Sequence, residues 1–217
     1  MDTEEGRRSK RDIIPHVENL VDLVFGLALS IGSLILITNP PQNSHDLLED
    51  VIAFAYGFII LVFIWEEFSQ TMMVVKVETK GMLRTTYIML FLVAIEPYLF
   101  NLITSPQQTG PNVEMIDSLA SMIYALDLAG LMLALAFFSD HITKQNNLEH
   151  SSLRAIYRSK RDSFLLSATI FLFSTLPFFW DSALLDLKLR YWLWILAPIL
   201  PRLYILVVKG GSLKRKV

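Results

Sequence analysis

The chain alternates between long apolar stretches and short polar segments. Six apolar stretches occupy residues 17–37, 47–65, 82–103, 118–138, 164–180 and 191–208. Each is close to the roughly 20 residues that an α-helix needs to cross the hydrocarbon core of a bilayer. The pattern therefore predicts an all-α membrane protein with six transmembrane helices.

The basic residues are distributed unevenly between the two sides of these helices. If residue 1 lies on the inner side, only Lys188 and Arg190 of the 19 Lys and Arg residues fall on the outer side. Because Lys and Arg concentrate in cytoplasmic loops, we expect a multi-pass protein of the cell membrane with both termini in the cytoplasm. The expected domains are a cytoplasmic N-terminal segment at 1–16, a membrane domain at 17–208 and a basic cytoplasmic tail at 209–217.

The composition narrows the chemistry. Hydrophobic residues make up 53% of the 217 residues, so too little polar surface remains for a soluble globule of this size. The chain has no cysteine, which excludes disulfides, thiolate nucleophiles and cysteine metal ligands. Its four histidines, His16, His45, His141 and His150, follow no metal-ligand spacing. We therefore expect no metal site, no cofactor and no nucleic-acid partner, and a lipid bilayer around the helices.

Two short motifs contain the residue types of known sites without the required arrangement. Ser139-Asp140-His141 has the three residue types of a hydrolase triad, but adjacent residues on a helix point about 100° apart and cannot converge on one atom. We predict no enzyme and no catalytic residue, and we expect the inner segment 139–162 to extend the helices on either side. Ala55-Tyr56-Gly57-Phe58 is distantly similar to the carbonyl filter of common potassium channels. It lies inside a continuous apolar helix, which favours ordinary packing.

The first predicted helix carries two stripes at helical spacing. Its small residues Gly26, Ser30 and Ser33 follow an i, i+4, i+7 pattern that lets membrane helices approach closely. A parallel apolar stripe has the same spacing and consists of Leu27, Ile31 and Leu34. By themselves, both stripes are also compatible with packing alone.

Two carboxylates near the inner end of this helix are harder to explain by packing. Glu18 and Asp22 lie one turn apart. A carboxylate at membrane depth costs at least ~2.5–3.5 kcal/mol on insertion scales, so such residues usually face protein or water. We expect Glu18 and Asp22 to have polar surroundings.

The first helix resembles that of the transmembrane protein 175 family of potassium channels. The family signature runs Arg, Leu, Glu, x, Phe-Ser-Asp, Gly-Val-Phe-Ala-Ile-Ala. The positions that coincide with it are Glu18, Asp22, Val24, Phe25 and Ala28, with Leu27 in place of the Ile. The departures are His16 in place of the Arg and Leu20-Val21 in place of Phe-Ser. Trp65 and Pro97 are similar to further family features, and the second half of the chain resembles the family in topology alone.

The resemblance implies a potassium-permeable channel that has no carbonyl filter. In that family, first helices from the assembled subunits line the pore, and six-helix prokaryotic subunits form homotetramers. Leu27 would then be the narrowest hydrophobic ring, Ile31 and Leu34 would form further layers, and Ser30 would supply hydroxyls that favour potassium ions. The resemblance also implies a structural polar network at the inner end of the helix, formed by His16, Glu18, Asp22 and Trp65.

Acidic residues on the expected outer side fit cation conduction independently of this resemblance. Eight of them outnumber the two basic residues there: Asp46, Glu49, Asp50, Glu96, Glu114, Asp117, Asp181 and Asp186. Such an excess concentrates cations at a pore mouth.

An alternative function rests on two charges set deep in the predicted helices. Asp127 and Arg202 lie about 14 and 16 Å from the outer ends of the fourth and sixth helices, at 1.5 Å per residue. Their matching depths predict an ion pair within one subunit. In a small secondary transporter or an accessory membrane protein, this pair would be the working polar site.

Overall fold

The computed structural model describes residues 17, 19–34, 43–74, 80–104, 113–144, 151–181, 183–184 and 187–200. The chain divides into two compact units, Met1–Thr109 and Gly110–Val217. We describe each unit by itself.

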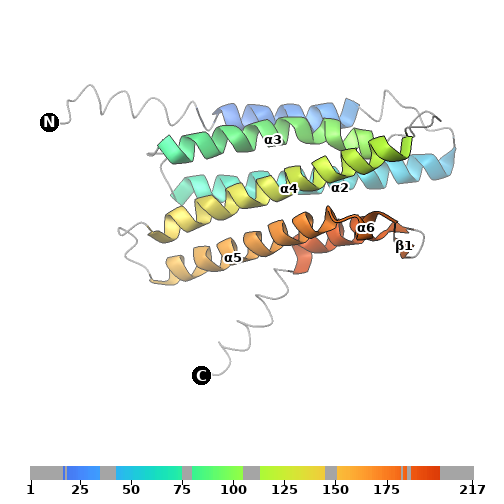
Figure 1. Cartoon of the computed structure of the whole chain (residues 1–217). Helices are drawn as coiled ribbons and strands as arrows, with labels where there is room; N and C mark the ends of the chain where they lie inside the picture. The colour runs from blue at the N-terminus through green and yellow to red at the C-terminus, as the bar shows by residue number, and fades with distance from the viewer. Residues whose placement is uncertain are drawn as a thin grey trace, which may run out of the picture. The chain divides into compact units, whose positions relative to one another are not determined.

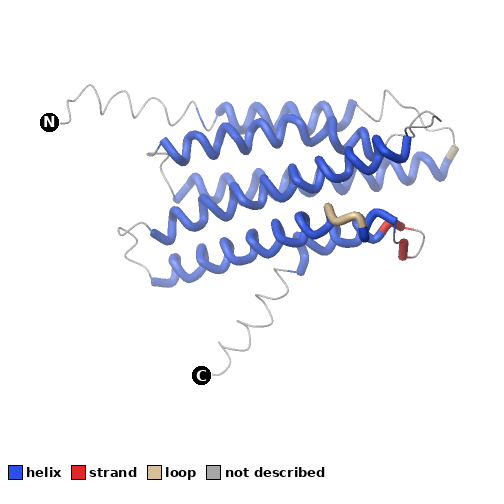
Figure 2. Tube along the Cα trace, viewed as in Figure 1, coloured by secondary structure: helices blue, strands red, loops and turns tan. Residues whose placement is uncertain are grey.

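The described residues are helical apart from short turns and one small β-ribbon (Figures 1 and 2). The first unit contains the helix Asn19–Leu34, α2 at Ser44–Val74 and α3 at Lys80–Thr104. The second unit contains α4 at Val113–Lys144, α5 at Ser151–Ser174, α6 at Phe178–Asp181 and the helix Leu189–Leu200. Strands β1, Ala183–Leu184, and β2, Leu187–Lys188, pair antiparallel, with Ala183 opposite Lys188 and Leu184 opposite Leu187.

Within the part of the chain that the structure describes, three helices are long and apolar enough to cross a membrane: Asp50–Val74 in α2, Lys80–Thr104, which is α3, and Ser118–Lys144 in α4. Their length and composition are compatible with a membrane protein. The helices Asn19–Leu34 and Leu189–Leu200 are apolar but shorter within the described residues. Helix α5 has 24 residues, and its N-terminal half carries the charged residues Arg154, Arg158, Lys160, Arg161 and Asp162.

The inner segment between α4 and α5 agrees with the sequence prediction, because α4 continues to Lys144 and α5 already begins at Ser151.

The fifth apolar stretch differs from the sequence prediction. It was expected to continue to residue 180, but α5 ends at Ser174 and a turn follows. Pro177 accounts for the early end, because a proline ring has no N–H for the helical ladder and disfavours a helical conformation for the residue before it. The backbone closes this turn with bonds from Thr175 N to Leu172 O and from Leu176 N to Phe173 O.

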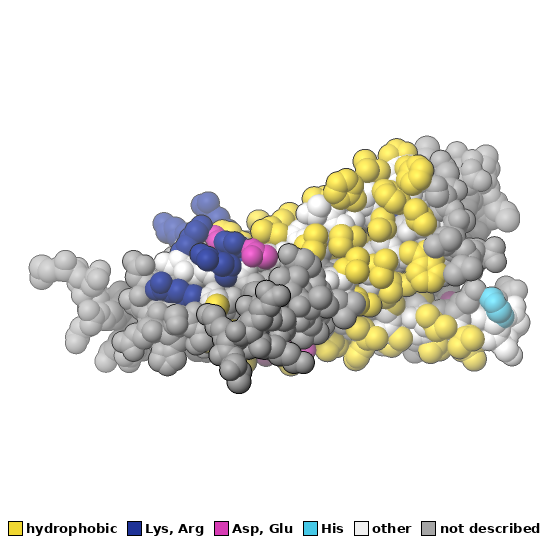
Figure 3. Space-filling model, turned by 90° about the horizontal axis from the view of Figure 1, so that it is seen from below, with side chains coloured by type: hydrophobic (Ala, Val, Ile, Leu, Met, Phe, Trp, Pro, Cys, Tyr) yellow, Lys and Arg dark blue, Asp and Glu magenta, His cyan; other side chains and the backbone are white. Residues whose placement is uncertain are grey.

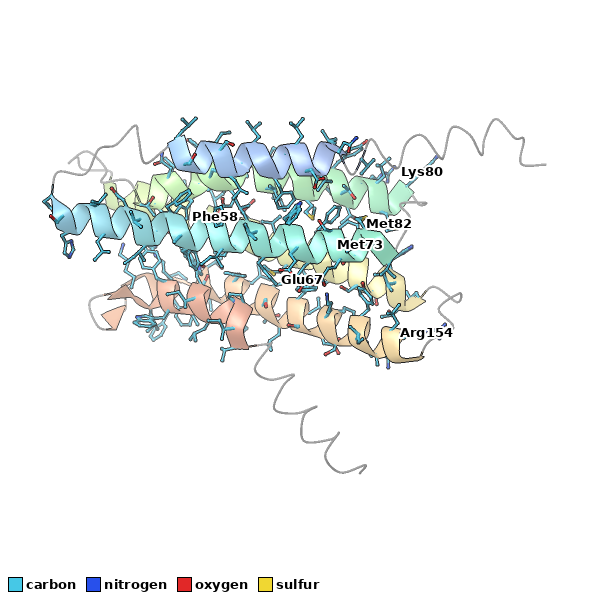
Figure 4. The ribbon with its side chains drawn as sticks, turned by 180° about the vertical axis from the view of Figure 1, so that it is seen from behind. Phe58, Glu67, Met73, Lys80, Met82 and Arg154 are labelled. Atoms are coloured by element: carbon cyan, nitrogen blue, oxygen red, sulfur yellow. The ribbon has the colours of Figure 1, made fainter. Side chains whose placement is uncertain are left out.

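The first unit packs around apolar residues at helical spacing. The helix Asn19–Leu34 buries Val21, Phe25 and Ala28, which follow i, i+4, i+7. Its Gly32 brings it close to α2, because a Cβ at this position would lie 3.7 Å from Phe54 Cε2. The C-terminal end of α2 at Met73 and the N-terminal end of α3 at Lys80 lie at the same end of this unit (Figure 4).

The second unit is built on the pairing of α4 with α5. Two hydrogen bonds attach the helix Leu189–Leu200 to α5, from Ser167 Oγ to Ala197 O at 2.7 Å and from Trp194 Nε1 to Ser174 Oγ at 2.9 Å. The order of these contacts makes the two helices antiparallel. The Trp194 ring also lies 5.0 Å from the Tyr124 ring on α4, centroid to centroid. Trp194 therefore joins three helices in one buried cluster.

Candidate functional site

The helix Asn19–Leu34 has two faces of different character. One face packs into the first unit through Val21, Phe25 and Ala28. The candidate constriction residues Leu27, Ile31 and Leu34 lie on the other face, and their side chains are 57%, 38% and 55% exposed. An apolar stripe of this kind in a single chain is suited to contact lipid, other copies of the chain or a narrow pore.

The small residues of the same helix also lie toward the exposed side. A Cβ at Gly26 would meet no atom within 4 Å, so the chain leaves open space there. Ser30 is exposed and its Oγ donates a hydrogen bond to Gly26 O at 2.8 Å, while Ser33 Oγ donates one to Ser30 O at 2.7 Å. These bonds satisfy the hydroxyl protons within the helix and leave the oxygen lone pairs available as acceptors.

A polar contact links this helix to α2. The Trp65 indole Nε1 donates a hydrogen bond to Asp22 Oδ1 at 2.9 Å. Both side chains are partly exposed in the single chain, and they lie 43 residues apart in sequence. Two members of the expected polar network are thus brought together. The other two members, His16 and Glu18, lie outside the described residues.

Asp127 lies on α4 and is only 4% exposed, so its carboxylate is buried. Its expected partner Arg202 lies outside the described residues. The described part of the same unit contains a buried cation, Arg190, which is 1% exposed. The Arg190 guanidinium carbon lies 5.1 Å from the centroid of the Tyr191 ring, in cation–π geometry.

Arg190 and Glu96 were both counted among the charges of the expected outer side, and both are buried in the chain. Arg190 is 1% exposed, and Glu96 on α3 is 2% exposed. A Cβ at Gly57 of α2 would lie 3.7 Å from Glu96 Oε1 and 3.6 Å from Phe100 Cδ1. Gly57 therefore packs against α3, as the ordinary-packing interpretation of Ala55-Tyr56-Gly57-Phe58 requires, and the space it leaves accommodates the Glu96 carboxylate.

An ion-pair cluster that the sequence did not predict joins α4 to α5. Asp140 Oδ1 accepts a hydrogen bond from Arg161 Nη1 at 3.0 Å, and Lys144 Nζ lies 2.6 Å from Asp140 Oδ2. Arg161 Nη2 also contacts Asp162 Oδ1 at 2.8 Å. The carboxylates of Asp162 and Asp140 raise the pKa of the Arg161 guanidinium above its ordinary value. Asp140 is therefore engaged with cations rather than oriented toward its sequence neighbours Ser139 and His141.

The described residues contain no group of three or more His, Cys, Asp or Glu side chains that could hold a metal ion. The candidate site on the helix Asn19–Leu34 therefore presents aliphatic side chains and hydroxyl groups on one exposed face. The contact between the Asp22 carboxylate and the Trp65 indole lies beside them.

Comparison with known proteins finds no family model that matches the chain and no match among curated proteins. The resemblance to the transmembrane protein 175 family rests on the residues quoted above.

Proposed function

We propose that the protein is a potassium-permeable cation channel whose pore is formed by the helix Asn19–Leu34 of several identical subunits. The subunit would cross the cell membrane six times with both termini in the cytoplasm, and four subunits would form the channel. Leu27 would provide the narrowest ring, with Ile31 and Leu34 in the next layers and Ser30 between them.

The observation that carries this proposal is the exposure of the apolar stripe on a helix whose opposite face is fully packed. The stripe contains no charged residue, and it continues past Leu27 for about two helical turns to Leu34. Stacked rings of aliphatic side chains can control conduction by excluding water when the pore is narrow. Hydroxyls that point into the same space can replace part of the hydration shell of a potassium ion.

The open space at Gly26 supports assembly through this helix. Small residues on a membrane helix allow the backbone of a neighbouring helix to approach closely. Gly26, Ser30 and Ser33 lie beside the apolar stripe, so one edge of the exposed face can contact the next subunit while Leu27, Ile31 and Leu34 face the axis. The Asp22–Trp65 contact would hold the inner end of the helix against α2 in this arrangement.

The direct test is ion flux through the purified protein in liposomes that are loaded with potassium chloride and diluted into a potassium-free medium. We expect a potassium flux above that of empty liposomes and a native mass of four chains. Tetrameric protein without any cation flux would contradict the proposal.

Selectivity and topology have separate readouts. We expect Ser30→Ala to shift the reversal potential between potassium and sodium toward that of an unselective pore, with the oligomer unchanged. An unchanged reversal potential would remove Ser30 from the selectivity mechanism. For topology, a reporter fused after Val217 should lie in the cytoplasm and one inserted near Gln107 should lie outside. The opposite pattern would contradict the cytoplasmic termini, and two reporters on the same side would contradict the six-helix arrangement.

A further inference from the structure

Helices α4 and α5 carry exposed apolar faces of different length. On α4 the large exposed apolar side chains begin near its N-terminal, outer end and follow helical spacing: Leu119, Ile123, Leu126, Leu133 and Phe137. They cover about 27 Å at 1.5 Å per residue, which is close to the thickness of a bilayer core. On α5 such side chains begin at Leu165, and the helix ends at Ser174, only about 14 Å farther outward.

The inner boundary of the α5 face is marked by charge. The N-terminal half of α5 carries Arg158, Lys160, Arg161 and Asp162, and the residues from there to Ser174 are uncharged. Figure 3 shows Lys and Arg side chains gathered at one end of the face seen from below, with hydrophobic side chains beyond them. Such a change from basic to apolar side chains marks the boundary between a polar region and a hydrocarbon region.

An ion pair at this boundary fixes the height of α5 relative to α4. Arg161 Nη1 lies 3.0 Å from Asp140 Oδ1. Counted outward from this pair at 1.5 Å per residue, α4 reaches Leu119 after about 32 Å, and α5 reaches Ser174 after about 20 Å. Helix α5 therefore ends about 12 Å below the outer end of the α4 face.

A second contact near the end of α5 gives the same result. Trp194 Nε1 donates a hydrogen bond to Ser174 Oγ at 2.9 Å, and the Trp194 ring lies 5.0 Å from the Tyr124 ring, centroid to centroid. Ser174 and Tyr124 are thus at similar heights, and α4 continues from Tyr124 to Leu119 for about 8 Å more. The two contacts together place the end of α5 about 8–12 Å below that of the α4 face.

The chain fills this remaining height with irregular backbone. Residues 175–177 form a turn, α6 is a single helical turn at Phe178–Asp181, and the ribbon of β1 and β2 follows. Irregular backbone that faces lipid does not occur within a hydrocarbon core, because its polar groups find no partners there. The Phe178 and Phe179 rings lie 5.3 Å apart and Trp180 follows them, and Trp is enriched where membranes meet water. Both features indicate a polar boundary close to Ser174.

We propose that the outer leaflet of the bilayer is thinned beside α5, so that lipid head groups occupy the height between the end of α5 and the outer end of α4. A bilayer accommodates a short apolar segment by local thinning at a modest cost in free energy. Head groups and their water then supply hydrogen-bond partners to the turn after Ser174, while the α4 face remains in hydrocarbon of ordinary thickness. The proposal rests on the membrane crossing that is part of the proposed function, and it does not require conduction.

The test measures the depth of spin labels on the full-length protein in phosphatidylcholine vesicles. Because the chain has no cysteine, a single introduced cysteine places the label at one site. Phe173→Cys on α5 is compared with Leu126→Cys on α4, since both residues are exposed and lie about 18 and 21 Å outward of the Arg161–Asp140 pair. Collision rates of the label with oxygen and with a water-soluble nickel chelate report its depth below the head groups.

Two further variants calibrate and repeat the measurement. Leu119→Cys reports the outer end of the α4 face, and Leu172→Cys is a second exposed site near the end of α5. We expect the Phe173 and Leu172 labels to lie about 8–12 Å closer to the head groups than the Leu126 label, at a depth similar to that of Leu119. In phosphatidylcholine with shorter acyl chains this difference should shrink, because the whole bilayer then approaches the length of the α5 face.

The opposite outcomes are distinct from one another. Equal hydrocarbon depths of the Phe173 and Leu126 labels would overturn the proposal, because the bilayer would then have uniform thickness. Exclusion of both oxygen and the nickel chelate at Phe173 would also overturn it, since protein in place of lipid would cover this face. Free access of the nickel chelate to Leu126 would contradict the membrane crossing of α4 itself.

Discussion

The Trp65 indole donates a hydrogen bond to the Asp22 carboxylate at 2.9 Å and so connects the candidate pore helix to α2. A carboxylate near the end of an apolar helix needs a partner to offset its loss of hydration. An indole is a suitable partner, because its ring packs among apolar groups and its single N–H can only donate. The contact holds one end of a helix that also buries Val21, Phe25 and Ala28.

The first prediction concerns this contact. Asp22→Ala and Trp65→Phe should each lower the thermal stability of the protein in detergent, by about 1–2 kcal/mol, because the first removes the acceptor and the second the donor of a hydrogen bond to a charged group. A double-mutant cycle measured by thermal unfolding separates this interaction from the other effects of each change. Losses that add without any coupling would show that the bond contributes nothing to stability.

A second prediction concerns assembly through Gly26. A Cβ at this position would meet no atom within 4 Å in the single chain, so we expect Gly26→Leu to leave the helix content and the fold of the subunit intact. If a neighbouring subunit approaches this glycine, the added side chain should separate the subunits. Native mass measurement should then detect monomers of Gly26→Leu, and tetramers of the control Gly32→Ala, whose Cβ would make an ordinary 3.7 Å contact with Phe54. Tetramers of Gly26→Leu would place Gly26 outside the interface.

The third prediction concerns the buried Asp127. Its proposed ion pair with Arg202 should make both Asp127→Asn and Arg202→Gln destabilising, since removing one partner of a buried pair commonly costs about 3–5 kcal/mol. The double variant should recover part of the loss in a thermal unfolding assay. A parallel cycle with Arg190→Gln tests the buried cation that the structure describes in the same unit.

Coupling of Asp127 with Arg190 in place of Arg202 would reject the depth-based pairing. An Asp127→Asn variant with the stability of the wild type and no flux would instead favour the transporter function.

The two faces of the helix Asn19–Leu34 could be predicted from the sequence, because helical periodicity separates Val21, Phe25 and Ala28 from Leu27, Ile31 and Leu34. The place of Trp65 beside Asp22 did not follow from periodicity. Periodicity cannot predict a contact across 43 residues, because it depends on how two helices are rotated relative to each other. The contact was expected only because of the family resemblance.

Other features depended on tertiary packing and were missed. Glu96 was counted on the expected outer side, but its burial did not follow from the sequence, because it depends on how Gly57 of α2 packs against α3. The Arg161–Asp140 pair requires the register between α4 and α5, which no local pattern contains. The end of α5 at Ser174 was also missed, because the apolar pattern continues to residue 180 and does not show the break three residues before Pro177.

The central claim is that the exposed stripe of the helix Asn19–Leu34 lines a pore, and the potassium flux of Leu27→Ala in liposomes tests it most directly. The matched control is Leu133→Ala, because Leu133 is an exposed leucine on α4 and the change removes the same atoms. If Leu27 forms the narrowest ring, its truncation should widen and wet the constriction and raise the flux, while Leu133→Ala should conduct like the wild type. A flux through Leu27→Ala equal to that of the wild type, from protein that is still tetrameric, would contradict this account.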